Sequence, residues 1–204
     1  VSGAGAAGSS IMFMLKQLGV PVILGFSKAG ILRKSESESM DFLSKELTEF
    51  TNPLDLKLTL AEALVGADVF IGVSAPRLVT SEMVKTMAKD PIVFALANPE
   101  PEISYEEAKK GGAAIIATGR SDFPNQVNNV LVFPGLFRGA LDAKATQITE
   151  AMKLAAAKGL ASLINETELS ADYIIPSAFD PRVADTVALA VKQVAIETGM
   201  VRKD

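Results

Sequence analysis

The stretch Gly3-Ala4-Gly5-Ala6-Ala7-Gly8, which has the spacing G-x-G-x-x-G, decides the fold that we expect for this chain. This spacing is informative where it joins a strand to a helix, because the first glycine makes a tight turn and the second lets a pyrophosphate approach the backbone. A helical pattern of apolar residues follows it, at Ile11, Met14, Leu15 and Leu18. The stretch predicts a dinucleotide-binding turn, with an ordinary structural turn as the alternative.

Only Val1 and Ser2 stand before this glycine loop, whereas a strand usually has five or six residues. We therefore expect that the chain is a fragment of a longer protein and lacks most of its own first strand. Its 204 residues fit one domain, and we expect residues 1–204 to form a single nucleotide-binding domain.

Outward from the loop, apolar runs alternate with helical patterns. Strands are expected at residues 20–26, 67–73, 91–97 and 113–118, and helices at 9–18, 40–50, 58–66, 80–88 and 104–110. Residues 27–39 are polar and rich in Ser and Glu, which predicts a solvated loop. From residue 128 onward the pattern is helical, with segments at 128–141 interrupted by Pro134, 145–163 and 182–198. The expected fold class is α/β, a doubly wound parallel sheet of the Rossmann type with a helical C-terminal tail.

Composition excludes several kinds of chemistry. The chain has no Cys and no His, which removes disulfides, thiolate and histidine metal ligands, and Ser-His-Asp triads. Its 20 Lys and Arg against 24 Asp and Glu give a net charge of -4, so nucleic acid is not an expected partner. No apolar run is long enough for a membrane span, and no membrane partner is expected.

The residues that would hold the ribose of the cofactor are expected about 20 positions after the glycine loop, where NAD enzymes carry an acidic residue. Counting from Gly8 leads to Ser27 and Lys28, and residues 26–33 contain no Asp or Glu. A small hydroxyl followed by Lys28, Arg33 and Lys34 can instead receive the 2'-phosphate of NADP through charge-assisted contacts. The cofactor is therefore NADP or NAD, with a modest preference for NADP. A basic surface turn is the alternative.

Polar loops follow the later strands, at the edge where ligands collect in doubly wound sheets. Asn98 follows one strand directly, and residues 123–129 (FPNQVNN) place four side-chain amides close to Arg120 and Asp122. Burying so many amides is costly unless something polar is bound there. A pocket for a small carboxylate is one interpretation. An Asx turn at Asn98 and a polar loop that caps the next helix are the alternatives.

Several of these stretches together resemble the malic enzymes of the bacterial type. The similar segments are residues 3–8, 94–102 (FALANPEPE), 119–129 (GRSDFPNQVNN), 133–142 (FPGLFRGALD), 173–176 (YIIP) and 179–182 (FDPR). The resemblance spans nearly the whole chain. It implies oxidative decarboxylation of L-malate to pyruvate and carbon dioxide, with reduction of NAD or NADP and assistance from Mg²⁺ or Mn²⁺.

The resemblance also implies roles for single residues. The dinucleotide loop falls on Gly3, Gly5, Ala6 and Gly8, and the cofactor site continues with Ser27, Lys28, Ser74 and Asn98. The substrate-contacting asparagines fall on Asn98 and Asn128, with Asn129 adjacent. Ser27 departs from the many relatives that carry Asp, which leaves the cofactor preference open.

Within this chain we expect no catalytic residue and no metal ligand. In the family the base Lys, the acid Tyr and the metal-binding carboxylates precede the glycine loop, so the isolated chain is expected to be inactive. For the parent we expect a cytoplasmic homodimer. Two alternatives remain: a non-catalytic regulatory or assembly module in a hybrid protein, and another dehydrogenase with a similar sheet, which would not need the pair Asn98 and Asn128.

Overall fold

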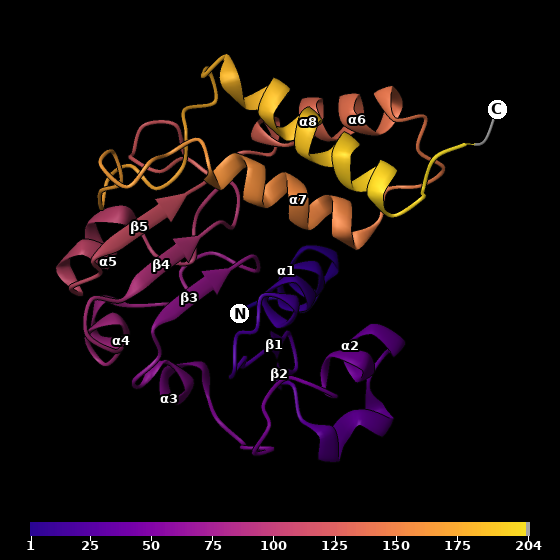
Figure 1. Ribbon diagram of the computed structural model, residues 1–204. Helices are drawn as coiled ribbons and strands as arrows, with labels where there is room; N and C mark the ends of the chain where they lie inside the picture. Colours follow the sequence, from indigo (N-terminus) through magenta and orange to yellow (C-terminus); the bar gives the residue numbers. More distant parts are fainter. Residues whose placement is uncertain (203–204) are drawn as a thin grey trace. The chain divides into compact units, whose positions relative to one another are not determined.

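The computed structural model describes residues 1–202 and divides the chain into two compact units, the first of residues 1–119 and the second beginning at Arg120 (Figure 1). The first unit contains α1 (Ala6–Gln17), β1 (Phe26–Ser27), β2 (Gly30–Ile31), the 3-10 helix η1 (Lys34–Ser39), α2 (Phe42–Leu47), α3 (Leu60–Leu64), β3 (Val69–Gly72), α4 (Ser81–Lys85), β4 (Ile92–Ala95), α5 (Tyr105–Lys110) and β5 (Ile115–Thr118). The second contains the 3-10 helix η2 (Asn129–Leu131), α6 (Phe133–Asp142), α7 (Glu150–Ala161) and α8 (Arg182–Glu197).

The first unit is built on parallel strands. Strand β4 lies between β3 and β5 and pairs in parallel with both (Figure 1). The segment before the glycine loop extends this order, because Ser2 forms one parallel bridge to Gly72 at the end of β3 and another to Phe26. The chain thus runs from Ser2 to Phe26 on one side and then to β3 on the other. This reversal of direction is the switch point at which doubly wound sheets bind ligands.

The strand expected at residues 20–26 is shorter than the apolar run suggested. Only Phe26–Ser27 is a named strand, and β1 pairs with β2 in an antiparallel hairpin. Residues 1–3 pair in parallel with the end of this apolar run. Within the run, their backbone forms hydrogen bonds with Leu24 and Phe26. Strand pairing therefore begins only where a partner is present.

The Val1 amino group takes part in this pairing. Its nitrogen donates to the carbonyl oxygen of Leu24 at 2.7 Å. The hydrogen bond extends the parallel pairing of residues 1–3 with the run that ends at Phe26.

The helices of the first unit begin where the sequence provides side-chain caps. Asp41, Thr59, Thr80 and Ser104 each accept a hydrogen bond from the backbone N–H three residues on, at the starts of α2, α3, α4 and α5. The serine-rich stretch expected as a loop at residues 27–39 contains part of the β1–β2 hairpin and η1 instead. Gly30, with φ of 126°, makes this hairpin turn possible, since such a backbone conformation is open mainly to glycine.

Two hydrophobic clusters hold the first unit together. Helices α3, α4 and α5 pack onto the sheet through Leu64, Val84 and Ala108, which join Phe70, Val93 and Ile116 from the three strands. Helices α1 and α2 contribute Met12 and Leu47 to a second cluster that includes Ile23 and Leu32. The two clusters position the strand ends and the glycine loop between them.

The second unit is helical, as the sequence predicted, and α8 packs against both α6 and α7 (Figure 1). Pro134 does not interrupt a helix. It occupies the first turn of α6, where a missing backbone N–H costs nothing, and the preceding segment is the separate helix η2. The expected helix at 145–163 begins later, at Glu150, because the Thr149 hydroxyl caps it. No helix in the described part of the chain has the length and apolarity needed to cross a membrane.

Helices α6 and α8 approach each other closely at glycines. A Cβ added at Gly135 would lie 2.6 Å from the Cβ of Val187, and one at Gly139 would collide with the carbonyl oxygen of Ala188. Gly159 on α7 also faces α8, but a Cβ there would meet the Ala190 methyl group at 3.1 Å and the Thr186 carbonyl oxygen at 3.5 Å, which is an ordinary van der Waals contact. Glycine is therefore required at position 139 and replaceable at position 159.

Gly139→Ala is expected to lower the unfolding free energy by about 2 to 3 kcal/mol, because the new methyl group must displace the backbone of α8. Gly159→Ala should change it by less than about 1 kcal/mol, since alanine favours the helix and the nearest neighbour of the added carbon is a methyl group. Urea denaturation of the 204-residue chain compares the two variants. Equal midpoints would show that the α6–α8 contact does not limit stability.

Candidate functional site

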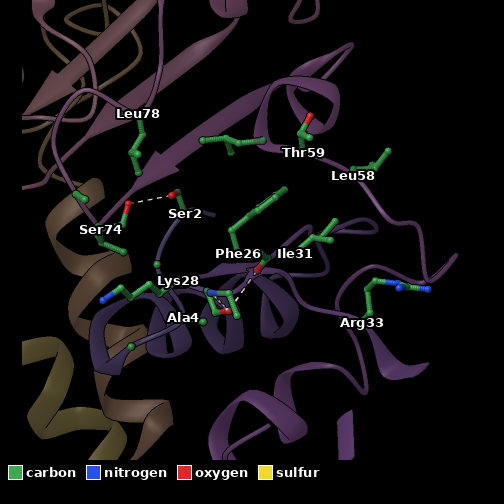
Figure 2. A pocket seen from close by; sticks show the side chains of 18 of the residues that line it. Ser2, Ala4, Phe26, Lys28, Ile31, Arg33, Leu58, Thr59, Ser74 and Leu78 are labelled. Carbon is green, nitrogen blue, oxygen red and sulfur yellow. Dashed lines mark hydrogen bonds between the residues drawn. The ribbon is translucent and has the colours of Figure 1, made fainter. Parts of the chain in front are cut away.

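A cavity of about 1040 Å³ opens at the carboxyl ends of the strands around the switch point (Figure 2). Three strand ends contribute to its wall: Ser2 with the glycine loop, Phe26 with the hairpin turn, and Val73 with the loop that follows β3. Five of the predicted site residues line it, namely Gly3, Gly5, Ser27, Lys28 and Ser74. Its size and position suit an elongated ligand held by backbone and small side chains.

Each glycine of the loop has a separate structural reason. Gly3 has φ of 109°, and a Cβ there would lie 2.7 Å from the carbonyl oxygen of Val73. A Cβ at Gly8 would collide with the carbonyl group of Gly3, so α1 can pack this closely only on glycine. Gly5 differs, because a Cβ there would meet nothing within 4 Å and would project into open space beside the cavity. The loop thus fits a pyrophosphate at Gly5 and needs the other two glycines for its own shape.

The first turn of α1 supplies donors for an anion. The first backbone bond of the helix runs from Ser9 N to Gly5 O at 2.9 Å, so the amides before Ser9, including that of Ala6, precede the helical ladder. The N-cap is Gly5, which has no side chain to cap them, and the first turn contains no acidic residue. These N–H groups and the positive end of the helix dipole favour a bound phosphate group.

Ser27 and Lys28 lie at the turn of the β1–β2 hairpin and line the cavity. Figure 2 shows Lys28 on this wall. The Ser27 hydroxyl accepts from Ala29 N at 3.1 Å and donates to Gly30 O at 3.3 Å, so it stabilises the turn. Within residues 1–202, the Lys28 ammonium is in none of the ion pairs that the structure shows. Lys28 is therefore available to a phosphate group on the ribose.

The next two basic residues along the chain, Arg33 and Lys34, are held by carboxylates. Arg33 lines the cavity, and its guanidinium contacts Glu36 at 2.5 Å and Asp55 at 3.6 Å. Lys34 pairs with Glu49 at 2.8 Å. The pKa of Asp55 is held below its ordinary value, mainly by hydrogen bonds from Ser35 and to a lesser degree by Arg33. Of these three basic residues, Lys28 is the best placed to contact a 2'-phosphate. Lys57, in the segment before α3, also lines the cavity.

The wall opposite the hairpin was not anticipated from the sequence. Leu58 and Thr59 line it before α3, and Leu78 lines it after β3 (Figure 2). Thr59 and Glu62 form a complete capping box, whose T-x-x-E spacing was visible in the sequence. Hydrogen bonds from the Thr59 backbone and hydroxyl lower the pKa of Glu62. The side chains of Leu58 and Leu78 give the cavity an apolar side that suits a flat ring.

Ser74 connects the cavity to the interior of the unit. Its hydroxyl lies 2.9 Å from that of Ser2, so the end of β3 is joined to the strand that leads into the glycine loop (Figure 2). Its backbone N–H donates to a carboxylate oxygen of Glu102 at 2.8 Å. Glu102 is wholly buried, and sequence analysis gave it no role.

The predicted substrate asparagines lie outside this cavity wall. Asn98 is exposed and follows β4, with a cis peptide bond to Pro99. Asn128 and Asn129 are exposed residues of the second unit, where the Asn128 side-chain oxygen accepts from Val130 N at 3.0 Å and caps η2. The structure thus gives Asn128 the capping contact that was the alternative to malate binding. Its role toward malate stays a prediction.

Asn125, in the same amide-rich stretch, is buried for a structural reason. Its side chain donates to Ala171 O at 2.8 Å and accepts from Ile174 N at 2.9 Å. These bonds compensate its burial without a ligand. Arg120 and Asp122 form a two-point ion pair, and the hydrogen bonds from Arg120 lower the pKa of Asp122. The amide stretch is therefore partly structural.

The described residues provide no set of side-chain ligands for a metal ion. Among residues 1–202, no three His, Cys, Asp or Glu side chains are grouped closely enough to hold a metal ion. The described residues therefore do not fit the Mg²⁺ or Mn²⁺ that the resemblance implies, and we derive no step through a metal.

The family model and the most similar sequences that we compared all point to the same protein family. Residues 1–196 match the family described as malic enzyme, NAD binding domain. The chain is 53% identical over 201 residues to the bifunctional malic/malolactic enzyme of Bacillus subtilis, and 50% identical over 204 residues to an NAD-dependent malic enzyme of Geobacillus stearothermophilus. An NADP-dependent malic enzyme of Rhizobium meliloti is 44% identical over 220 residues.

Solved structures agree. A crystal structure of Entamoeba histolytica malic enzyme superposes on the whole chain with a TM-score of 0.92 at 38% identity, and that of a malic enzyme from Pyrococcus horikoshii does so with 0.90 at 41%. The matches to the Bacillus subtilis and Geobacillus stearothermophilus enzymes cover 98% and 100% of this chain. They cover only 49% and 42% of the length of those two relatives. It covers 43% and 49% of the two crystallised chains. The fold is therefore Rossmann-like, and the match extends over about half of each of these relatives.

Proposed function

Because the chain belongs to the malic enzyme family, as a member of its NAD-binding domain, we propose that it holds NADP or NAD in the cavity at the switch point for a malate-oxidising parent enzyme. The parent would convert L-malate to pyruvate and carbon dioxide. When bound, the dinucleotide supplies a nicotinamide that can accept the hydride from C2 of malate.

The observation that carries the proposal is the glycine loop. Gly3 and Gly8 are required by backbone contacts, whereas Gly5 leaves open space beside the uncapped start of α1. A pyrophosphate needs such a space next to free amide donors. The hairpin turn with Ser27 and Lys28 lies on the same cavity, where the ribose of the adenosine half would follow.

The roles of this chain are binding and orientation. Ser74 lies on the cavity wall after β3, where it can position the nicotinamide half of the cofactor. Asn98 and Asn128 are proposed to donate through their amides to malate, with Asn129 adjacent, and this requires no proton transfer from either residue. The base, the acid and any metal ligands would come from residues outside this chain. We also propose that the parent is a homodimer.

The test is malate turnover by the full-length parent beside the 204-residue chain. With malate and a divalent metal ion, the parent should form reduced dinucleotide and pyruvate in equal amounts. The 204-residue chain should bind the dinucleotide and show no malate-dependent reduction, since hydride transfer needs a base to take the hydroxyl proton. A parent that leaves malate unchanged would contradict the function, and turnover by the short chain would contradict the division of roles.

Ser27→Asp is expected to shift the preference of the parent at least tenfold from NADP toward NAD, judged by the ratio of kcat/KM values. A carboxylate at this position would repel the 2'-phosphate and accept ribose hydroxyls. Ser39→Asp adds the same charge at the end of η1, outside the cavity wall, and should leave the ratio within twofold. An unaltered parent that already uses NAD tenfold more efficiently than NADP would contradict the predicted preference.

A further inference from the structure

A buried carboxylate joins two loops that the proposed reaction needs. Glu102 lies in the segment between β4 and α5, and its side chain is 0% exposed. One carboxylate oxygen accepts from Ser74 N at 2.8 Å and lies 3.3 Å from the Ser74 hydroxyl. The other accepts from Ala97 N at 3.0 Å. The side chain therefore ties the end of β3 to the end of β4.

The structure makes room for this carboxylate at a specific glycine. A Cβ at Gly72, the last residue of β3, would collide with the carboxyl carbon of Glu102. Within residues 1–202, the ion pairs that the structure shows do not include Glu102, and its partners are two backbone amides and one hydroxyl. Burying a carboxylate is costly, so these three hydrogen bonds must hold it firmly.

The two loops have different tasks in the proposed function. Ser74 lines the cofactor cavity and also contacts the Ser2 hydroxyl, which leads into the glycine loop. Ala97 directly precedes Asn98, the asparagine proposed to bind malate. The path from Ser2 through Ser74 and Glu102 to Ala97 thus crosses the carboxyl ends of three neighbouring strands.

From this juxtaposition we propose that Glu102 is a positioning residue for hydride transfer. It fixes the loop on the cofactor side and the loop on the substrate side relative to each other, through their backbone amides. This inference rests on the proposed function, because it assigns the two loops to the two reactants. Small errors in such alignment lower the rate of the chemical step far more than they lower binding.

The test compares Glu102→Gln with Glu100→Gln in the full-length parent. Glutamine keeps the size of Glu102 but replaces one accepting oxygen by an NH₂ donor, which then faces a backbone N–H. Glu100 is an exposed neighbour whose carboxylate pairs with Arg77 at 2.9 Å, so its variant is the matched control. The measurements are kcat with malate, the isotope effect on kcat with malate deuterated at C2, and the melting temperature.

We expect Glu102→Gln to lower kcat tenfold or more and to raise the isotope effect, because hydride transfer becomes more rate-limiting. Glu100→Gln should leave both within twofold. A folded Glu102→Gln enzyme with a lower melting temperature but unaltered kcat and isotope effect would overturn the proposal, since Glu102 would then be only structural. A wild-type parent without malate-dependent reduction would overturn the proposed function first and this inference with it.

Glu102→Asp keeps the proposal testable if Glu102→Gln cannot be purified folded. Aspartate keeps the buried carboxylate but is one methylene shorter, so it should not span Ser74 N and Ala97 N as Glu102 does. It should lower kcat and raise the isotope effect by a smaller amount than Glu102→Gln. Wild-type values of both in this variant would then overturn the proposal.

Discussion

Gly5→Val is expected to weaken binding of NADPH or NADH to the 204-residue chain at least 100-fold, about 2.7 kcal/mol. The added side chain finds open space in the protein alone, because a Cβ at Gly5 has no neighbour within 4 Å. That space lies on the cavity and at the start of α1, where the pyrophosphate must approach. Fluorescence titration with the reduced dinucleotide measures the loss.

The fold of this variant should remain. Gly5 has φ of -76°, which valine adopts readily, although valine is a poor N-cap and costs about 1 kcal/mol of helix stability. Ala114→Val is the matched control, because it adds comparable apolar bulk at an exposed position before β5, at the opposite edge of the sheet. Equal affinity of wild type and Gly5→Val would place the dinucleotide elsewhere.

Asn128→Ala in the full-length parent is expected to reduce kcat/KM for malate about tenfold or more, with dinucleotide affinity nearly unchanged. Loss of one amide contact to a charged substrate typically costs on the order of 1 to 3 kcal/mol. The change appears as a higher KM, a lower kcat or both. Steady-state kinetics with malate and equilibrium titration with the dinucleotide separate the two ligands.

The capping contact of Asn128 requires its own control. The side-chain oxygen accepts from Val130 N, so the alanine variant also loses the cap of η2. Asn128→Ser keeps an acceptor suited to an N-cap but lacks the amide donor. If the amide binds malate, serine should be as defective as alanine. Wild-type kinetics in Asn128→Ser would show that Asn128 only caps the helix.

The parts of the fold that depend on neighbouring residues were predictable from sequence. The glycine spacing, the alternation of apolar runs with helical patterns and the caps at Thr80 and Ser104 are local signals, and the structure confirms the α/β order and the helical tail. Gly8 is required by its neighbour Gly3, whereas the contact that requires Gly3 is with Val73, 70 positions further along the chain.

The parts that depend on distant residues were not predictable. Glu102 meets Ser74 across 28 positions, and no spacing rule announces a buried carboxylate between two strand-end loops. Arg33 was expected to be available to a phosphate, but Asp55, 22 positions away, and the neighbouring Glu36 hold its guanidinium. Ser27 was expected to face the ribose, and its hydroxyl also stabilises the hairpin that replaced the expected loop.

The most direct test of the central claim is a crystal structure of the 204-residue chain with bound NADP. We expect pyrophosphate oxygens within hydrogen-bond distance of the first-turn amides of α1, beside Gly5, and the 2'-phosphate next to Ser27 and Lys28. The nicotinamide half should reach toward Ser74. A dinucleotide bound away from the glycine loop, or with its pyrophosphate turned from the start of α1, would contradict the account.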